Sequence, residues 1–296
     1  MFRLHRLRSR PASQLTLEAW IERAVRKNAR AKEEGTLLHL ALMDSRMDIV
    51  DHFLERGARV DVKNRWGLSP LIIARLLNRE SALLPIERFR QLPLLIYRNK
   101  DRAIHSLSLD EFERKLGITY IDTLEFQEAD HLSWVIRKCN QRLKRKSCYR
   151  MDRWMNALYR EKIDAIRRDR YYIRWISSDI GYGVFAAQSI PSLTYVGEYT
   201  GVIKKRCVRK QRDNDYIFGY SIGTGETPLV IDAEKRGNFS RFINHSYYPN
   251  LTSRSMIFDG VSHIILFTNR WVQRGEQLTY DYGKHYWKSR FSPDPL

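Results

Sequence analysis

The stretch "RGNFSRFINHSYYPN" (residues 236–250) places Asn244 and His245 side by side. An apolar pair, Phe242 and Ile243, precedes them, and a Ser-Tyr-Tyr-Pro-Asn turn follows. Turns are built mainly from Gly, Pro, Asn, Asp and Ser, and they rarely need a histidine. An Asn-His pair held just before a proline-fixed bend is therefore predicted to serve a site.

The sequence on both sides of this stretch is rich in short β-type runs. These runs, separated by Gly, Pro, Asn and Asp, are "GVFAA", "TYVGEYTG", "PLVIDA", "MIFDGVSHIILF" and "EQLTYDYG". In the fourth run, Asp259-Gly260 between two apolar segments predicts a β-hairpin. Short strands with long irregular connections predict a β-rich domain from Tyr171 onward, with loops that carry a site.

Five motifs follow one another in this half of the chain. They are "GYG" (181–183), "GEYTG" (197–201), "NDYIF" (214–218), the stretch 236–250 and "EQLTYDYGKHYW" (276–287). In this order they resemble the SET domain, the fold of protein-lysine methyltransferases that use S-adenosylmethionine. The resemblance covers about residues 171–287 and predicts a SET domain over 168–290. The implied fold class is α+β, with a β-rich domain that contains a pseudoknot.

The resemblance assigns a cofactor site. It implies that the Asn244-His245 segment threads through a loop of the C-terminal segment and contacts S-adenosylmethionine. Gly181, Tyr182 and Gly183 resemble the turn along the cofactor's amino-acid end. Tyr216 resembles the tyrosine that lines both the cofactor and the lysine sites.

The catalytic assignment also rests on the resemblance, and Tyr282 matches the family's catalytic tyrosine, which also borders the cofactor. Methyl transfer from a sulfonium to an amine needs alignment more than acid-base power, so tyrosine hydroxyls and backbone carbonyls suffice. Tyr216 is grouped with the catalytic residues. Tyr280, two residues before Tyr282, is expected to limit the product to mono- or dimethyllysine. Glu198 is predicted to be a structural or a surface residue rather than a base.

The N-terminal part nearly repeats itself at an offset of 33 residues, from "TLLHLA" at Thr36 to "SPLIIA" at Ser69. Between them "MDIVDHFLE" carries an apolar helical face and Gly57 stands at its expected C-terminal cap. This period resembles the ankyrin repeat, so residues 14–80 are predicted to form an ankyrin-like helical module with a helical cap. Two alternatives stay open: a surface for a protein partner, or a module that only packs against the rest of the chain.

Residues 81–167 are predicted to be a mostly helical, basic connecting region. The overlapping stretch 137–174 holds fourteen Lys/Arg against four Asp/Glu, with aromatic residues interleaved. It is either a contact for nucleic acid or nucleoprotein, or a solvated helix face.

Charge and cysteine content limit the function further. The 52 Lys+Arg exceed the 34 Asp+Glu, and the formal net charge of +18 suits an anionic partner as well as an ordinary basic protein. Three scattered cysteines predict reduced thiols, no metal site and an intracellular location. No apolar run approaches membrane-spanning length, which predicts no membrane contact.

A SET domain without zinc clusters behind an ankyrin-like segment resembles proteins of intracellular bacteria that modify chromatin proteins. The implied enzyme is an S-adenosylmethionine-dependent protein-lysine N-methyltransferase acting on a basic histone or histone-like protein. Its location is either the bacterial cytoplasm or a host nucleus. The alternative is a catalytically inactive SET/ankyrin adaptor that only binds proteins.

Overall fold

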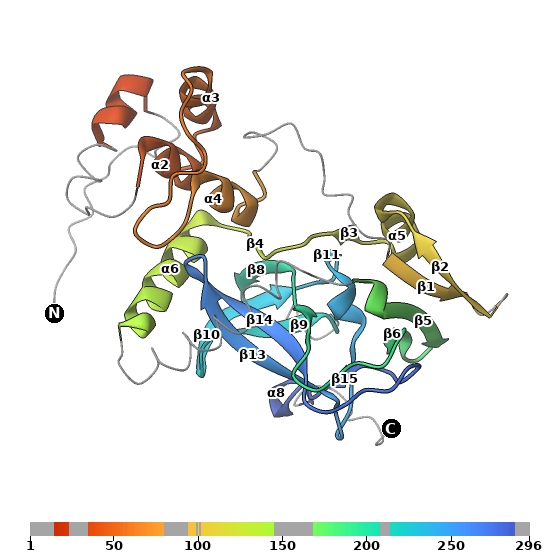
Figure 1. Cartoon of the computed structure of the whole chain (residues 1–296). Coiled ribbons are helices and arrows are strands. Elements are labelled where there is room, and N and C mark those ends of the chain that lie inside the picture. Colours follow the sequence, from red (N-terminus) through yellow and green to blue (C-terminus); the bar gives the residue numbers. More distant parts are fainter. Residues whose placement is uncertain are drawn as a thin grey trace. The chain divides into compact units, whose positions relative to one another are not determined.

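The computed structural model describes residues 15–23, 35–79, 94–98, 100, 102–144, 168–207 and 214–287 (Figure 1). The chain divides into two compact units, Met1–Ile86 and Glu87–Leu296, and each is described by itself. No helix within the described ranges is long and apolar enough to cross a membrane.

The first unit contains the short helices α2 (Leu37–Met43), α3 (Met47–Glu55) and α4 (Pro70–Leu76), and residues 17–23 before them are also helical. Thr36 and His39 form a capping box at the start of α2, and the other ring nitrogen of His39 lies 3.1 Å from the Leu68 carbonyl. That contact ties the first repeated segment to the second. Ser69 caps α4, and Gly57 follows α3 in the left-handed conformation. The helical character of this module is confirmed, and its ankyrin identity stays a prediction.

The second unit is built from three main sheets. The first has the order β2 (Ala103–Leu107), β1 (Leu94–Arg98), β5 (Tyr171–Ser177), β6 (Gly181–Ala186). The second has the order β4 (Glu125–Phe126), β8 (Val202–Lys205), β10 (Gly225–Asp232), β9 (Ile217–Ile222). The third has the order β13 (Leu251–Phe258), β14 (Val261–Thr268), β7 (Tyr195–Glu198).

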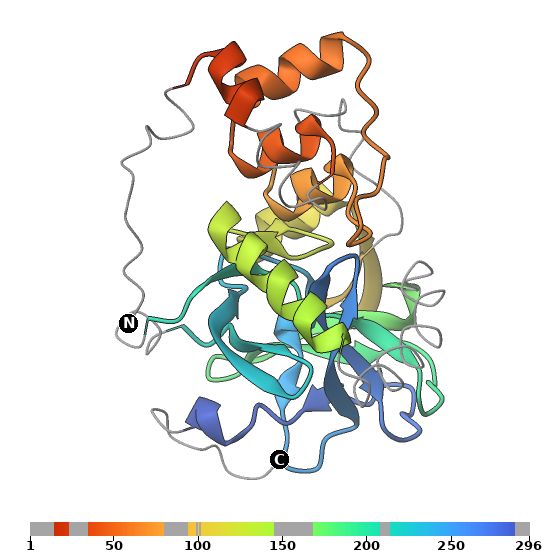
Figure 2. The same ribbon diagram turned by 90° about the vertical axis from the view of Figure 1, so that its left-hand side faces the viewer.

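The hairpin predicted at Asp259-Gly260 is confirmed. Both residues have positive φ, 43° and 75°, and Phe258 faces Val261 across the turn. This conformation matches the right-handed twist of the two strands, and it explains why Asp-Gly stands there. The helix α6 (Ala129–Leu143) packs across β14 and β9, in the views of both Figure 1 and Figure 2.

The prediction of a mostly helical connecting region over 81–167 is wrong for the described residues 94–144. These contain four strands besides α5 (Leu109–Leu116) and α6. β1 pairs in parallel with β5, β4 with β8, and β3 (Thr119–Tyr120) with β11 (Arg236–Gly237). The boundary at 168 is therefore also wrong, because these strands complete the sheets of the β-rich domain. Residues 145–167, with the rest of the predicted basic cluster, lie outside the described residues.

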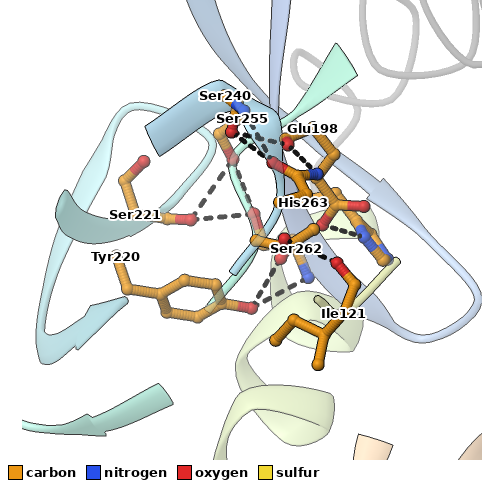
Figure 3. A network of polar contacts seen from close by, with 10 residues as sticks. Ile121, Glu198, Tyr220, Ser221, Ser240, Ser255, Ser262 and His263 are labelled. Atoms are coloured by element: carbon orange, nitrogen blue, oxygen red, sulfur yellow. Dashed lines mark hydrogen bonds and ion pairs between the residues drawn. The ribbon is translucent and has the colours of Figure 1, made fainter. Parts of the chain in front are cut away.

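A network of buried hydrogen bonds holds the segment that precedes the Asn244-His245 pair (Figure 3). Glu198 Oε1 lies 2.8 Å from His263 Nδ1, and the Glu198 carbonyl accepts from the Ser240 hydroxyl at 3.1 Å. The Asn238 amide also donates to that carbonyl, at 2.9 Å. Asn238 and Ser240 begin the 3-10 turn η5 (Phe239–Phe242), which leads directly into the Asn-His pair. Glu198 is buried, which excludes a surface position, and its structural role stays a prediction.

Candidate functional site

The two most specific motifs meet as a short parallel bridge. β12 (Asn244–His245) pairs with β15 (Thr279–Tyr280), so that Asn244 faces Thr279 and His245 faces Tyr280. The Ser246 amide extends the contact by donating to the Tyr280 carbonyl at 3.3 Å. A pseudoknot requires this juxtaposition of segments far apart in sequence, and the threading itself stays a prediction.

Tyr282 is anchored to the Asn-His segment by two hydrogen bonds. Its hydroxyl donates to the Ile243 carbonyl at 2.9 Å, and its backbone amide donates to His245 Nδ1 at 3.2 Å. Burial raises the pKa of the Tyr282 phenol well above its usual value, and the neighbouring Tyr199 and Tyr286 raise it further. Tyr282 is therefore a neutral hydroxyl group, suited to orienting a substrate rather than to removing a proton.

Aromatic rings surround Tyr282. Its ring centroid lies 4.8 Å from Tyr280, 4.7 Å from Tyr286 and 6.2 Å from Trp287, and the last pair is stacked. Phe218 stacks on Tyr280 at 5.8 Å. Tyr286 and Trp287 belong to α8 (Lys284–Trp287), so this short helix packs against Tyr282. The result is an apolar aromatic wall of the kind that lowers the pKa of an amine enclosed by it.

His245 presents one ring nitrogen without a partner. Because Nδ1 accepts the Tyr282 amide, the proton is assigned to Nε2, which is buried and has no hydrogen-bond partner within the described part of the chain. The Trp287 indole nitrogen is likewise buried and unpartnered there, and the two rings lie 4.9 Å apart. Burial also lowers the pKa of His245, so the ring is neutral at pH 7. Two unpaired donors side by side call for an acceptor, since leaving them unsatisfied is costly.

The predicted glycine turn lies against this segment. The Asn244 side-chain amide donates to the Tyr182 carbonyl at 3.2 Å, which joins β6 to β12. Gly181 has φ +76° and open space where a Cβ would stand. A Cβ on Gly183 would lie 2.6 Å from the Ile176 Cδ1 atom, so only glycine fits without a shift.

Tyr216 is linked to the aromatic wall through Tyr199, whose ring packs on Phe218. Its carbonyl accepts from the Tyr199 hydroxyl at 3.1 Å, and its ring stacks under the Arg241 guanidinium at 3.6 Å. Tyr216 and Tyr199 both contribute to the raised pKa of Tyr282. The structure thus gathers Tyr182, Tyr216, Asn244, His245, Tyr280 and Tyr282 around one aromatic cluster.

Sequence reasoning missed two members of this cluster. Tyr199 lies within the quoted "GEYTG" motif, and Arg241 within the opening stretch. For Arg241 the sequence did contain a signal that could have been used. The arginine lies inside the apolar run "FSRFI", and a buried arginine requires a specific partner.

No group of three metal-ligating side chains occurs among the residues that the structure describes. Cys139 is buried and Cys207 exposed, and both are free, while Cys148 lies outside the described residues.

Comparison with known proteins places this site in a family context. Residues 181–283 match the family model described as "SET domain". The histone-lysine N-methyltransferase set-2 of Caenorhabditis elegans is 34% identical over 129 residues, which is 41% of this chain and 8% of that protein. The mouse histone-lysine N-methyltransferase EHMT1 is 36% identical over 142 residues, 45% of this chain and 10% of that protein.

Among solved structures, Arabidopsis thaliana SUVH6 in complex with SAM is 27% identical to this chain. The match covers 38% of this chain and 28% of the SUVH6 chain, with a TM-score of 0.35. The chain therefore spans a tenth or less of the length of the two curated relatives named above.

Proposed function

We propose that this chain is a protein-lysine N-methyltransferase that takes its methyl group from S-adenosylmethionine. The main observation in support is the geometry of the site. Tyr282 is hydrogen-bonded to Ile243 and His245, within the segment that matches the SET domain. The names of the relatives, histone-lysine methyltransferases, support the same reaction.

The residues of the site fit such a cofactor. The unpaired donors of His245 and Trp287 suit a ligand rich in acceptor atoms. The open backbone at Gly181 lets a ligand approach the main chain closely. When bound, S-adenosylmethionine supplies a methyl group attached to a positively charged sulfur.

The chain's own residues then orient and desolvate the lysine. The aromatic wall formed by Tyr280, Tyr282 and Tyr286 excludes water, so an enclosed ammonium loses its proton more easily. The Tyr282 hydroxyl and the carbonyl to which it is bonded are preorganised polar groups that direct the amine. Alignment of an amine lone pair with a methyl group is the main requirement of an in-line displacement.

A basic histone or histone-like substrate is part of the proposal. The net charge of +18 opposes binding of a free basic protein, but it favours a basic protein held on nucleic acid. Near the site two exposed carboxylates offset the general charge: Asp215, 3.4 Å from the Tyr286 hydroxyl, and Asp281, 3.7 Å from His245 Nδ1. We therefore propose a nucleoprotein substrate inside a cell, with the helical unit as an additional protein contact.

The alternative function is an inactive adaptor. A binding-only protein has no need of an anchored tyrosine hydroxyl beside two unpaired donors, so the site favours the enzyme. The test is transfer of label from methyl-labelled S-adenosylmethionine to free core histones, histones on DNA and a bacterial histone-like protein. The modified residue is then located by mass spectrometry. Transfer to a lysine ε-amine supports the proposal, and absence of label on every protein at high enzyme concentration contradicts it.

A further inference from the structure

Arg241 is a buried cation without a carboxylate partner in the part of the chain that the structure describes. Its exposed fraction is 7%. One guanidinium nitrogen donates to the Glu234 carbonyl at 3.1 Å, and the Nε atom is buried without a partner. A buried charge that is neither ion-paired nor fully hydrogen-bonded is costly, so its retention requires a reason.

The charged groups that face Arg241 do not neutralise it. The nearby carboxylate of Asp232 is already taken by Lys204 and by the Asn214 amide. Glu234 offers its backbone carbonyl, while its side chain is directed to Asn214 at 3.5 Å. The remaining neighbours are the phenols of Tyr216 and Tyr199.

The guanidinium instead lies over aromatic rings. It is 3.6 Å from the Tyr216 ring centroid and 4.9 Å from the Phe242 ring centroid. Tyr216 is also held from the backbone, since its amide donates to Asn214 Oδ1 at 2.9 Å and its carbonyl accepts from Tyr199. The ring is thus fixed with a positive charge on one of its faces.

We propose that Arg241 is a positioning residue that fixes the Tyr216 ring and sets a permanent positive charge behind it, which favours the neutral form of the substrate lysine. This inference rests on the proposed function and on the role that the family resemblance implies for Tyr216, a tyrosine that lines the lysine site; the ring face opposite Arg241 is then the face toward the lysine. An ammonium on that face would lie about twice the guanidinium–ring separation from Arg241, roughly 7 Å. At an effective dielectric between about 20 for protein sites and about 80 for bulk water, a unit charge at that distance lowers the pKa of an amine by roughly one unit.

Phenols and carboxylates of other elements also face this region. Tyr282 and Tyr199 stay neutral because burial raises the pKa of each phenol. Among the described residues, the carboxylates of Asp215 and Asp281 at the rim carry the opposing charge. Asp215 helps an ammonium to bind, whereas Arg241 promotes its deprotonation within the channel.

The experiment compares Arg241→Gln, which removes the charge, with Arg241→Lys, which keeps it. The pH dependence of kcat/KM is measured from pH 7 to 10 on a peptide spanning the lysine found by mass spectrometry. In Arg241→Gln the midpoint of the rising limb should move up by roughly one pH unit, so activity falls about tenfold at pH 7.5 and recovers at pH 9.5 or above. Arg241→Lys should keep the midpoint of the unmodified enzyme. A loss of equal size at every pH in Arg241→Gln would mean a merely structural role and overturn the proposal, as would an unchanged profile.

A second measurement needs no variant. NMR titration of a carbon-13-methyl-labelled dimethyllysine peptide, bound to the unmodified protein without cofactor, gives the amine's pKa directly. A bound pKa below that of the free peptide is expected, and an equal or higher one overturns the inference. Failure of the proposed function looks different, because no label would then reach any protein.

Discussion

Replacing Tyr282 with Phe removes one oxygen atom whose contact is known. The lost bond is the one from the Tyr282 hydroxyl to the Ile243 carbonyl at 2.9 Å. Ile243 is 1% exposed, so water cannot readily take over the contact. A lost hydrogen bond that leaves a buried acceptor unpaired costs about 1–2 kcal/mol of the free energy of unfolding. The Ile243 carbonyl directly precedes Asn244, so the same deletion also loosens the site backbone.

The effect on catalysis should be larger than the effect on stability. Loss of one preorganised polar contact in a transition state slows a reaction by roughly 100-fold or more, about 2.7 kcal/mol. Single-turnover transfer of labelled methyl measures the rate, calorimetry measures cofactor affinity, and urea unfolding measures stability.

Tyr280→Phe is the matched control for stability. It deletes the same atom from a ring 4.8 Å away. The Tyr280 hydroxyl makes no hydrogen bond to the described residues, so stability should change by less than about 0.5 kcal/mol. A folded Tyr282→Phe protein with near-normal turnover would refute the catalytic assignment.

Four further predictions follow from the same structure. Asn244→Ala should weaken binding of S-adenosylmethionine more than binding of substrate peptide, because its amide holds the Tyr182 carbonyl of the glycine turn; calorimetry with both ligands checks this. Tyr280→Phe should raise the methylation state reached on one peptide, because it enlarges the space beside Tyr282; abundant trimethyllysine from the unmodified enzyme in mass spectrometry would contradict the reasoning. Burial lowers the folded-state pKa of His39, so below about pH 6.5 the unfolded chain binds a proton that the folded chain does not. The free energy of unfolding should therefore fall as the pH drops from about 6.5 toward the lowered pKa, by up to about 1.4 kcal/mol per pH unit. Thermal unfolding at several pH values checks this, and the His39→Gln variant should lose the dependence. Chelation with EDTA should leave methyl transfer unchanged, because the three cysteines lack paired ligand spacing, and stoichiometric zinc in the purified protein would overturn this.

Local chemistry explains which elements the sequence could predict. Asp259-Gly260 predicted its hairpin because few residue pairs tolerate two successive positive φ angles. Gly57 predicted the end of α3 for a similar reason, since glycine adopts the left-handed cap without strain. The site residues could be named because they lie in compact motifs, and the structure brings the two most specific ones together at β12 and β15.

The strands β3 and β4 were missed because their partners, β11 and β8, are distant in sequence. β1 and β2 form a local hairpin, and only the second partner of β1, the strand β5, is distant. β3 and β4 have only two residues each, too few for a periodicity to appear. They are stabilised by tertiary contacts, such as the bidentate ion pair of Arg236 with Glu125 at 2.7 Å on each oxygen. Arg241 was missed for a similar reason. Its role depends on its contact with the ring of Tyr216, and Tyr216 belongs to a different sequence motif.

The bridge between β12 and β15 has a consequence for how the protein folds. The β13–β14 hairpin lies in sequence between Asn244–His245 and the residues they pair with, Thr279 and Tyr280. The hairpin joins neighbours in sequence and forms on a microsecond scale. The bridge requires closure of a longer loop, which costs more conformational entropy. A growing chain that has not reached Thr279 can therefore form the hairpin but not the paired site. We therefore expect assembly of the site to follow formation of the hairpin, so that activity returns after refolding more slowly than the sheets form.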